Sequence, residues 1–205
     1  MALLVGASWS HHGHKHVRKA PPCSLRGSKT IYRDTSVRVY TKDFPETASR
    51  DAEFDTFACL FAVNKRRFMV GDVGDFFAEW FLALTIRPPW IAYGDFGGSR
   101  YGNDFAKVCS LNLRTGARRC SPIGSYDPST VRVNGIGLTR AGSVAWMQTD
   151  TVYNPPVVSV YERDAGRKKP VTLDSGTDID RSSFAVGGRY IYWTKAGTPR
   201  SATMP

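Results

Sequence analysis

The chain has 205 residues, a formal net charge of +10 and 41% hydrophobic residues, so it is long enough for one folded domain and too apolar to be disordered throughout. All 4 histidines lie between positions 11 and 16. Residues 17–205 therefore cannot carry His-based nucleophilic catalysis, His-based acid–base catalysis or a His-ligated metal site.

The first segment resembles the end of a signal peptide. Met1–Gly6 is apolar and small residues follow it, although the positive n-region is missing. The His-rich run at 11–16 is interpreted as a tail with chance affinity for metal ions, and no metal or cofactor site is assigned. We expect a signal-like leader and disordered tail over 1–22 and one domain over 23–205. No other segment has the apolar length of a membrane span.

The rest of the chain is typical of one short strand after another. The expected strands are 29–33, 37–40, 57–61, 68–70, 80–86, 90–93, 106–113, 117–121, 131–138, 143–148, 157–163, 167–173, 184–186, 190–194 and 200–204, with 95–103 as a Gly-rich loop. No segment combines a sustained period of 3.6 with helix caps. The sequence therefore predicts an all-β fold.

Three segments align with one another, about fifty residues apart, which is typical of a fold built from repeated β units. They are Cys59–Arg67, Leu111–Arg119 and Tyr161–Lys169. Each has a strand-like run, then Asn or Gly, then two basic residues. Asn64, Gly116 and Gly166 are expected at hairpin turns with positive φ, which these residue types accept at low cost.

A second recurring element is an aromatic residue that ends an apolar run. It occurs at Ile31-Tyr32, Ala92-Tyr93, Ala145-Trp146 and Tyr192-Trp193. We expect each pair in an inner strand whose aromatic side chain packs against the next unit. With about fifteen short strands, this predicts roughly four units of three or four strands each.

The cysteines form an even set, Cys23, Cys59, Cys109 and Cys120, which is typical of an exported protein with two disulfides. Three pairings are possible. Cys109–Cys120 is favoured because a tight turn at Arg114–Gly116 would place them opposite each other, and this leaves Cys23–Cys59. A zinc site is not indicated, because no C-x-x-C pair exists.

Several carboxylates were weighed as catalytic or metal-binding groups. Asp174-Ser175-Gly176-Thr177 matches the aspartic protease signature but occurs once, so Asp174 is interpreted as a turn residue that caps the N–H of Gly176 or Thr177. Weak calcium or glycosidase patterns are interpreted as loop polarity. They involve Asp178 and Asp180, Asp95 and Asp104, and Asp72, Asp75 and Glu79. No catalytic residue is assigned.

The basic residues follow the aligned turns, as Arg66-Arg67, Arg118-Arg119 and Arg167–Lys169. We interpret them as solvated hairpin tips. Binding of an anionic polymer would require them to gather on one face, which a radial arrangement of units could achieve. A nucleic-acid partner is not favoured.

The hairpins with Leu113–Gly116 and Asp164–Arg167 resemble blade hairpins of Tol-type and WD-type β-propellers. Residues 22–205 resemble secreted propeller-like proteins of unknown function from actinobacteria. The matching segments are Cys23, 27–40, 58–60 with 66–67, 113–119, 138–146, 173–179 and 192–204. The resemblance implies a β-propeller-like fold and no catalytic residue. The chain is short for six or seven blades. A propeller of about four units and an incomplete propeller are therefore both compatible with the sequence.

These patterns favour a non-enzymatic, secreted binding or scaffold module. It would contact protein or glycan through one loop face and lie outside the cell or at the cell envelope. The alternative is a carboxylate- or metal-dependent hydrolase that acts on an extracellular polymer. That alternative requires carboxylates such as Asp72, Asp95, Asp174, Asp178 and Asp180 to meet in one cleft.

Overall fold

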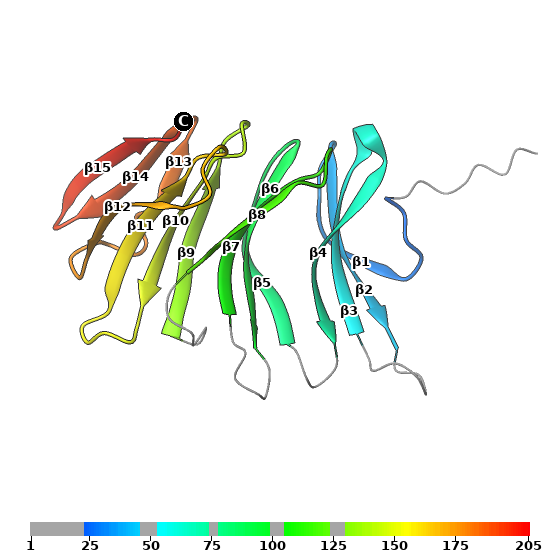
Figure 1. Ribbon diagram of the computed structural model, residues 1–205, viewed down its shortest axis with the longest axis horizontal. Helices are drawn as coiled ribbons and strands as arrows, with labels where there is room; N and C mark the ends of the chain where they lie inside the picture. Colours follow the sequence, from blue (N-terminus) through cyan, green and yellow to red (C-terminus); the bar gives the residue numbers. More distant parts are fainter. Residues whose placement is uncertain (1–22, 46–52, 74–77, 99–104, 124–129) are drawn as a thin grey trace, which may run out of the picture.

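The computed structural model describes residues 23–45, 53–73, 78–98, 105–123 and 130–205, and over these ranges it is all-β (Figure 1). The strands form four antiparallel sheets, which agrees with the predicted number of units. A single 3-10 turn, Phe61–Val63, is the one helical element in these ranges. No helix there is long and apolar enough to cross a membrane.

Each sheet consists of strands that follow one another in the chain. Sheet I contains β1 (Ser28–Arg33), β2 (Val37–Phe44), β3 (Glu53–Leu60) and β4 (Lys65–Val73). Sheet II contains β5 (Ala78–Arg87), β6 (Trp90–Gly98), β7 (Phe105–Asn112) and β8 (Arg118–Pro122). Sheet III contains β9 (Val131–Leu138), β10 (Val144–Asp150), β11 (Val157–Arg163) and β12 (Val171–Gly176). Sheet IV contains β13 (Ala185–Gly187), β14 (Tyr190–Lys195) and β15 (Thr198–Thr203).

The four sheets lie in a row from sheet I to sheet IV (Figure 1), and a cluster of buried side chains fills each space between neighbours. In β10, Val144 and Trp146 belong to the cluster shared with sheet II, whereas Ala145 and Met147 belong to the cluster shared with sheet IV. Successive side chains of a strand point to opposite faces. The middle strands are therefore apolar on both faces, which explains their continuous apolar runs.

Three of the four recurring aromatic residues lie in the second strand of a sheet, and the structure corrects two expectations about the four. Tyr93, Trp146 and Trp193 are buried in the clusters shared with the preceding sheet, not the next one. Tyr32 lies in edge strand β1 and is 38% exposed. The buried aromatic residue in the second strand of sheet I is Tyr40 of β2 and not Tyr32, and it lies on the outer face of that sheet.

The three aligned segments each connect the third and fourth strands of a sheet. The strand pairing corrects the register of the third segment. The buried aromatics Tyr40, Tyr93 and Trp146 face Phe57, Cys109 and Tyr161 across the sheet. Phe57, Cys109 and Tyr161 are therefore equivalent positions of the three segments. The residue equivalent to Cys59 and Leu111, two positions later, is Arg163 and not Tyr161. The offset arises because the connection over 164–170 is longer than those over 61–64 and 113–117.

The turn residues follow the expectation in two of three cases. Asn64 has φ 48° and Gly116 has φ 87°, but Gly166 is not among the positive-φ residues. Its turn is closed instead by hydrogen bonds from Arg167 N to Asp164 O and from Gly166 N to Asp164 Oδ1, which needs no left-handed residue. Several strand boundaries also differ. For example, β6 continues through Gly98, where a loop is expected from position 95, and β12 starts only at Val171.

Both predicted disulfides are confirmed. Cys23–Cys59 has a Cα–Cα distance of 5.4 Å, and Cys109–Cys120 joins directly opposed residues of β7 and β8 with a Cα–Cα distance of 4.0 Å. The first bond holds the segment before β1 against the outer face of sheet I. Arg38 reinforces it by donating hydrogen bonds to the Cys23 carbonyl and the Ser28 hydroxyl while it lies over the Tyr40 ring.

Candidate functional site

One end of the sheet row gathers the short connections between first and second and between third and fourth strands, at the top of Figure 1. Hydrogen bonds link these connections to one another, as from Leu113 N to Pro89 O and from Ala165 N to Ser143 Oγ. We call it the basic end, because exposed Arg and Lys side chains lie in or beside its connections. They are Arg33, Lys65, Arg66, Arg87, Arg114, Arg118, Arg119, Arg140, Arg167, Lys168, Lys169 and Arg189.

The acidic side chains in the same connections are used to build the turns. Asp34 Oδ1 accepts hydrogen bonds from Ser36 N and Val37 N, and Asp164 Oδ1 accepts one from Gly166 N. Burial works against ionisation of Asp34, but the bonds from Ser36, Val37 and Tyr32 outweigh it and lower the pKa of Asp34. Together with Glu162 near the end of β11, these carboxylates offset only part of the positive charge, because the described basic residues at this end outnumber them.

The opposite end differs in charge. Its described connections, 151–156, 177–184 and 196–197, contain Asp178, Asp180 and Arg181 but no further charged side chain. In the sequence the basic residues are spread over the repeats and are interpreted as solvated tips, with gathering on one face left possible for a radial arrangement. The topology does bring them to one end, because every sheet starts in the same direction and reverses at the same end.

Some basic residues of this region hold the sheets together. Arg67 of β4 donates to the carbonyl groups of Leu113 and Arg114 at 3.3 and 2.7 Å. Arg118 of β8 donates in return to the carbonyl group of Phe68. Gly116 combines its left-handed φ with close approach to Arg67, because a Cβ atom there would lie 2.8 Å from the Arg67 guanidinium. These two arginines tie sheet I to sheet II.

Arg163 ties sheet III to sheet II and is only 2% exposed. Its guanidinium donates to Ser121 Oγ at 2.9 Å, Ser110 Oγ at 2.8 Å and the Arg119 carbonyl at 3.0 Å. Burial, with a smaller contribution from Arg119, lowers the pKa of Arg163 to about 10. The side chain stays charged at neutral pH and acts as an internal clip, out of reach of a ligand.

The aromatic rings near the basic end are covered by arginine side chains. Arg33 lies over Phe61, Arg66 over Phe57 and Arg118 over Phe68, with guanidinium-to-ring distances of 5.4 to 5.7 Å. Such stacking is favourable through the ring quadrupole. Phe57 and Phe61 are therefore not open platforms for stacking a ligand, whereas Phe68 remains 46% exposed.

Asp174 is held by sheet IV, which corrects the predicted cap on Gly176 or Thr177. Its Oδ1 accepts from Lys195 Nζ at 2.7 Å and Ser175 N at 2.8 Å, and its Oδ2 accepts from Trp193 Nε1 at 2.8 Å. Burial works against ionisation, but the bonds from Lys195 and Trp193 prevail and lower the pKa of Asp174. The carboxylate is a structural tie between sheets III and IV.

The other candidate carboxylates do not converge in the described part of the chain. Asp178 Oδ1 lies 3.9 Å from Lys195 Nζ, Asp180 accepts from the Ser182 N–H and hydroxyl groups, and Asp95 is buried in sheet II. The remaining ones lie outside the residues whose side chains are described, as does the His-rich run at 11–16. They are Asp72, Asp75, Glu79 and Asp104.

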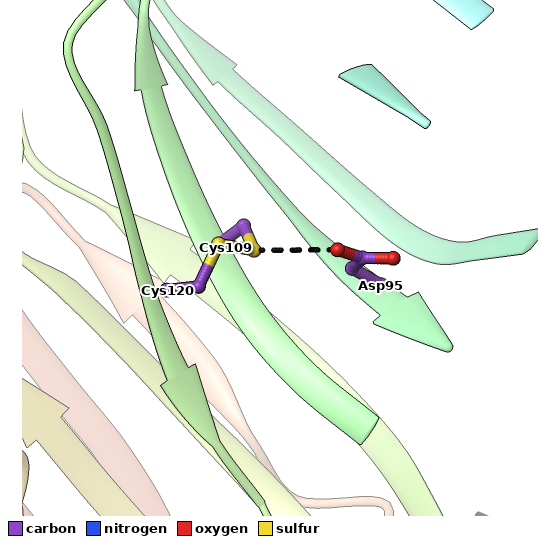
Figure 2. A group of neighbouring side chains, drawn as sticks. All are labelled: Asp95, Cys109 and Cys120. Carbon is purple, nitrogen blue, oxygen red and sulfur yellow. Dashed lines mark hydrogen bonds between the residues drawn. A yellow bond between two sulfur atoms is a disulfide. The ribbon is translucent and has the colours of Figure 1, made fainter. Parts of the chain in front are cut away.

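Figure 2 shows the one close group of acidic and sulfur side chains, Asp95, Cys109 and Cys120, among the described residues. Asp95 Oδ2 lies 3.7 Å from Cys109 Sγ. The two sulfur atoms are bonded to each other, whereas metal binding and nucleophilic attack both require a thiolate. In this state the group is a buried cross-strand disulfide beside a carboxyl group, not a metal or catalytic site.

The sequence did not predict that Arg87, Arg140 and Arg189 lie close together. The available signal was a basic residue beside the turn residues Pro88-Pro89, Gly142 and Gly188, but the sequence did not show which turns share an end. No protein-family model, curated protein or solved structure matches the chain. The geometry described above is therefore what indicates its function.

Proposed function

We propose that the chain is a non-enzymatic binding module that recognises an acidic glycan through its basic end. In this proposal the four sheets are the blades of an open, propeller-like array, and the protein works outside the cell or at the cell envelope. The observation that carries the proposal is the gathering of exposed Arg and Lys side chains at one end, where they outnumber the described acidic side chains.

Two observations favour a glycan over a nucleic acid. Single-stranded nucleic acids are bound on exposed aromatic platforms, whereas Phe57 and Phe61 lie beneath guanidinium groups. The two disulfides are compatible with an extracellular location, where acidic polysaccharides are available partners. Arginine suits such a ligand, because its planar fork pairs with carboxylate and sulfate groups in two-point contacts.

The test is binding to heparin and polyglucuronate over a series of salt concentrations. We expect measurable binding that weakens as salt rises, because anionic polymers release counterions when basic residues bind. The informative variant is Lys168→Ala/Lys169→Ala, which removes two exposed charges from the basic end. It should weaken binding and lower the salt slope by roughly one for each lysine removed.

The control removes two positive charges away from the basic end, as Arg181→Ala/Arg200→Ala. If this control weakened polymer binding as much as the lysine variant, net charge alone would explain the interaction and the basic end would have no special role. Tighter binding to single-stranded DNA than to both polysaccharides would likewise contradict the choice of glycan.

A further inference from the structure

A cavity of about 530 Å³ opens at the basic end where sheets II, III and IV meet. Each sheet supplies one arginine to its lining: Arg87 ends β5, Arg140 lies between β9 and β10, and Arg189 lies between β13 and β14. All three are exposed, and the structure gives their guanidinium groups no hydrogen-bonded or ion-paired partner among the described residues. No acidic side chain lines the cavity.

The exposed apolar floor of the cavity is formed by Ala141 and Pro205, whereas Leu138 is 2% exposed and Met204 fully buried. A bare inorganic anion would satisfy the arginines but leave this floor uncovered. A ligand with an oxyanion on a compact ring that presents C–H groups would use both. Sites that bind small molecules commonly combine apolar walls with a few polar groups that fix the orientation.

The walls are held in place without a ligand. Gly142 has φ 95° and no room for a side chain, because the Trp90 ring of sheet II occupies the position of a Cβ atom. This contact fixes the turn of Arg140 beside the turn that follows Arg87. On the other side, Met204 N donates to the Arg189 carbonyl at 2.7 Å. Because the cavity exists before binding, less binding free energy is lost to the ordering of its side chains and turns.

We propose that this cavity binds one acidic sugar residue. The sugar carboxylate or sulfate would pair with Arg87, Arg140 and Arg189, and its ring would pack on Ala141 and Pro205. The inference rests on the proposed function and deepens it, since it separates one specific subsite from the diffuse attraction of the basic end. A free anion and the charged group of a sugar share the chemistry that the arginines recognise, so the probes must distinguish them.

The experiment titrates the protein with glucuronic acid, glucose and inorganic phosphate, observed by NMR chemical shifts. The pocket variant is Arg140→Gln/Arg189→Gln, and the charge-matched control is Arg181→Gln/Arg200→Gln, two exposed arginines away from the basic end. We expect glucuronic acid to bind the unchanged protein at least tenfold more tightly than glucose or phosphate. The pocket variant should lose at least tenfold in affinity for it, and the control less than twofold.

Two results would overturn the inference. Equal effects of the pocket and control variants would show that the cavity adds nothing to general electrostatics. Phosphate affinity equal to that of glucuronic acid would show an anion site that does not recognise a sugar. If polyglucuronate binds while the monosaccharide does not, the subsite proposal fails and the proposed function stands. If neither binds, the proposed function fails as well.

Discussion

Individual polar side chains tie each sheet to the next. Arg67 and Arg118 join sheets I and II, Arg163 joins sheets II and III, and Asp174 joins sheets III and IV. Each charge is satisfied by several hydrogen bonds, which limits the cost of removing it from water. These ties fix how one sheet lies on the next, and so they position the turns of the basic end.

The tie at Asp174 predicts a pH dependence of stability. Because the pKa of Asp174 is lowered in the folded chain, its contribution should be complete above about pH 4, the usual pKa of an aspartate, and should disappear as the pH falls further. Asp174→Asn should therefore lower the free energy of unfolding at pH 7 by about 1 kcal/mol. The difference between the two proteins should shrink towards pH 2.5.

Urea denaturation at several pH values measures this, with Asp43→Asn, an exposed residue of β2, as the control. A difference that stayed constant from pH 7 to pH 2.5 would show that the charge of Asp174 contributes nothing to the tie.

Among the secondary-structure elements, β9 depends on two glycines at its contact with sheet IV. A Cβ atom on Gly137 would collide with Val186, and one on Gly135 would lie 2.7 Å from the Phe184 ring. Glycine inside a strand usually weakens it. Here it allows sheet IV to approach the backbone of β9 closely.

Gly137→Ala should therefore destabilise the protein by about 1–3 kcal/mol through overpacking. Val186→Ala in the same chain should restore part of that loss, because it removes the methyl groups that collide. Gly166→Ala is the matched control and should change stability by less than about 0.5 kcal/mol, since the nearest atom would be 3.9 Å from its Cβ. Additive effects of Gly137→Ala and Val186→Ala in urea denaturation would contradict this contact.

The elements themselves were largely predictable from the sequence, because alternating apolar residues and turn residues are local signals. The expected strands at 131–138 and 157–163 agree with β9 and β11. Register across the sheets was less predictable. Arg163 occupies the buried position equivalent to Cys59 and Leu111, but a charged residue gives no sign of burial when its partners, Ser110 and Ser121, lie some fifty residues away in another sheet.

At the scale of the whole molecule, the candidate site is a product of topology. A basic residue beside a turn is visible in the sequence, as with Arg140 and Arg189, but its neighbours depend on how the sheets stack. The disulfide partners could be predicted because Cys109 and Cys120 flank one hairpin. The arginine-lined cavity could not, because its walls come from three separate sheets.

The row of sheets also predicts unequal stability along the molecule, since each sheet packs only on its neighbours. Sheets II and III are covered on both faces, and the outer face of sheet I is covered by the segment held through Cys23–Cys59. The outer face of sheet IV is open, with Tyr190 47% and Tyr192 43% exposed.

Hydrogen exchange should therefore be slowest in β6, β7, β10 and β11 and faster in β14 and β15, because local opening needs less free energy where fewer apolar contacts are lost. Reduction of the disulfides should speed exchange in sheet I more than in sheet III, which contains no cysteine. Mass spectrometry of peptic fragments measures both effects. If β14 and β15 exchanged as slowly as β10 and β11, the outer face of sheet IV would have to be covered in solution. The prediction that sheet IV opens more easily than the central sheets would then be wrong.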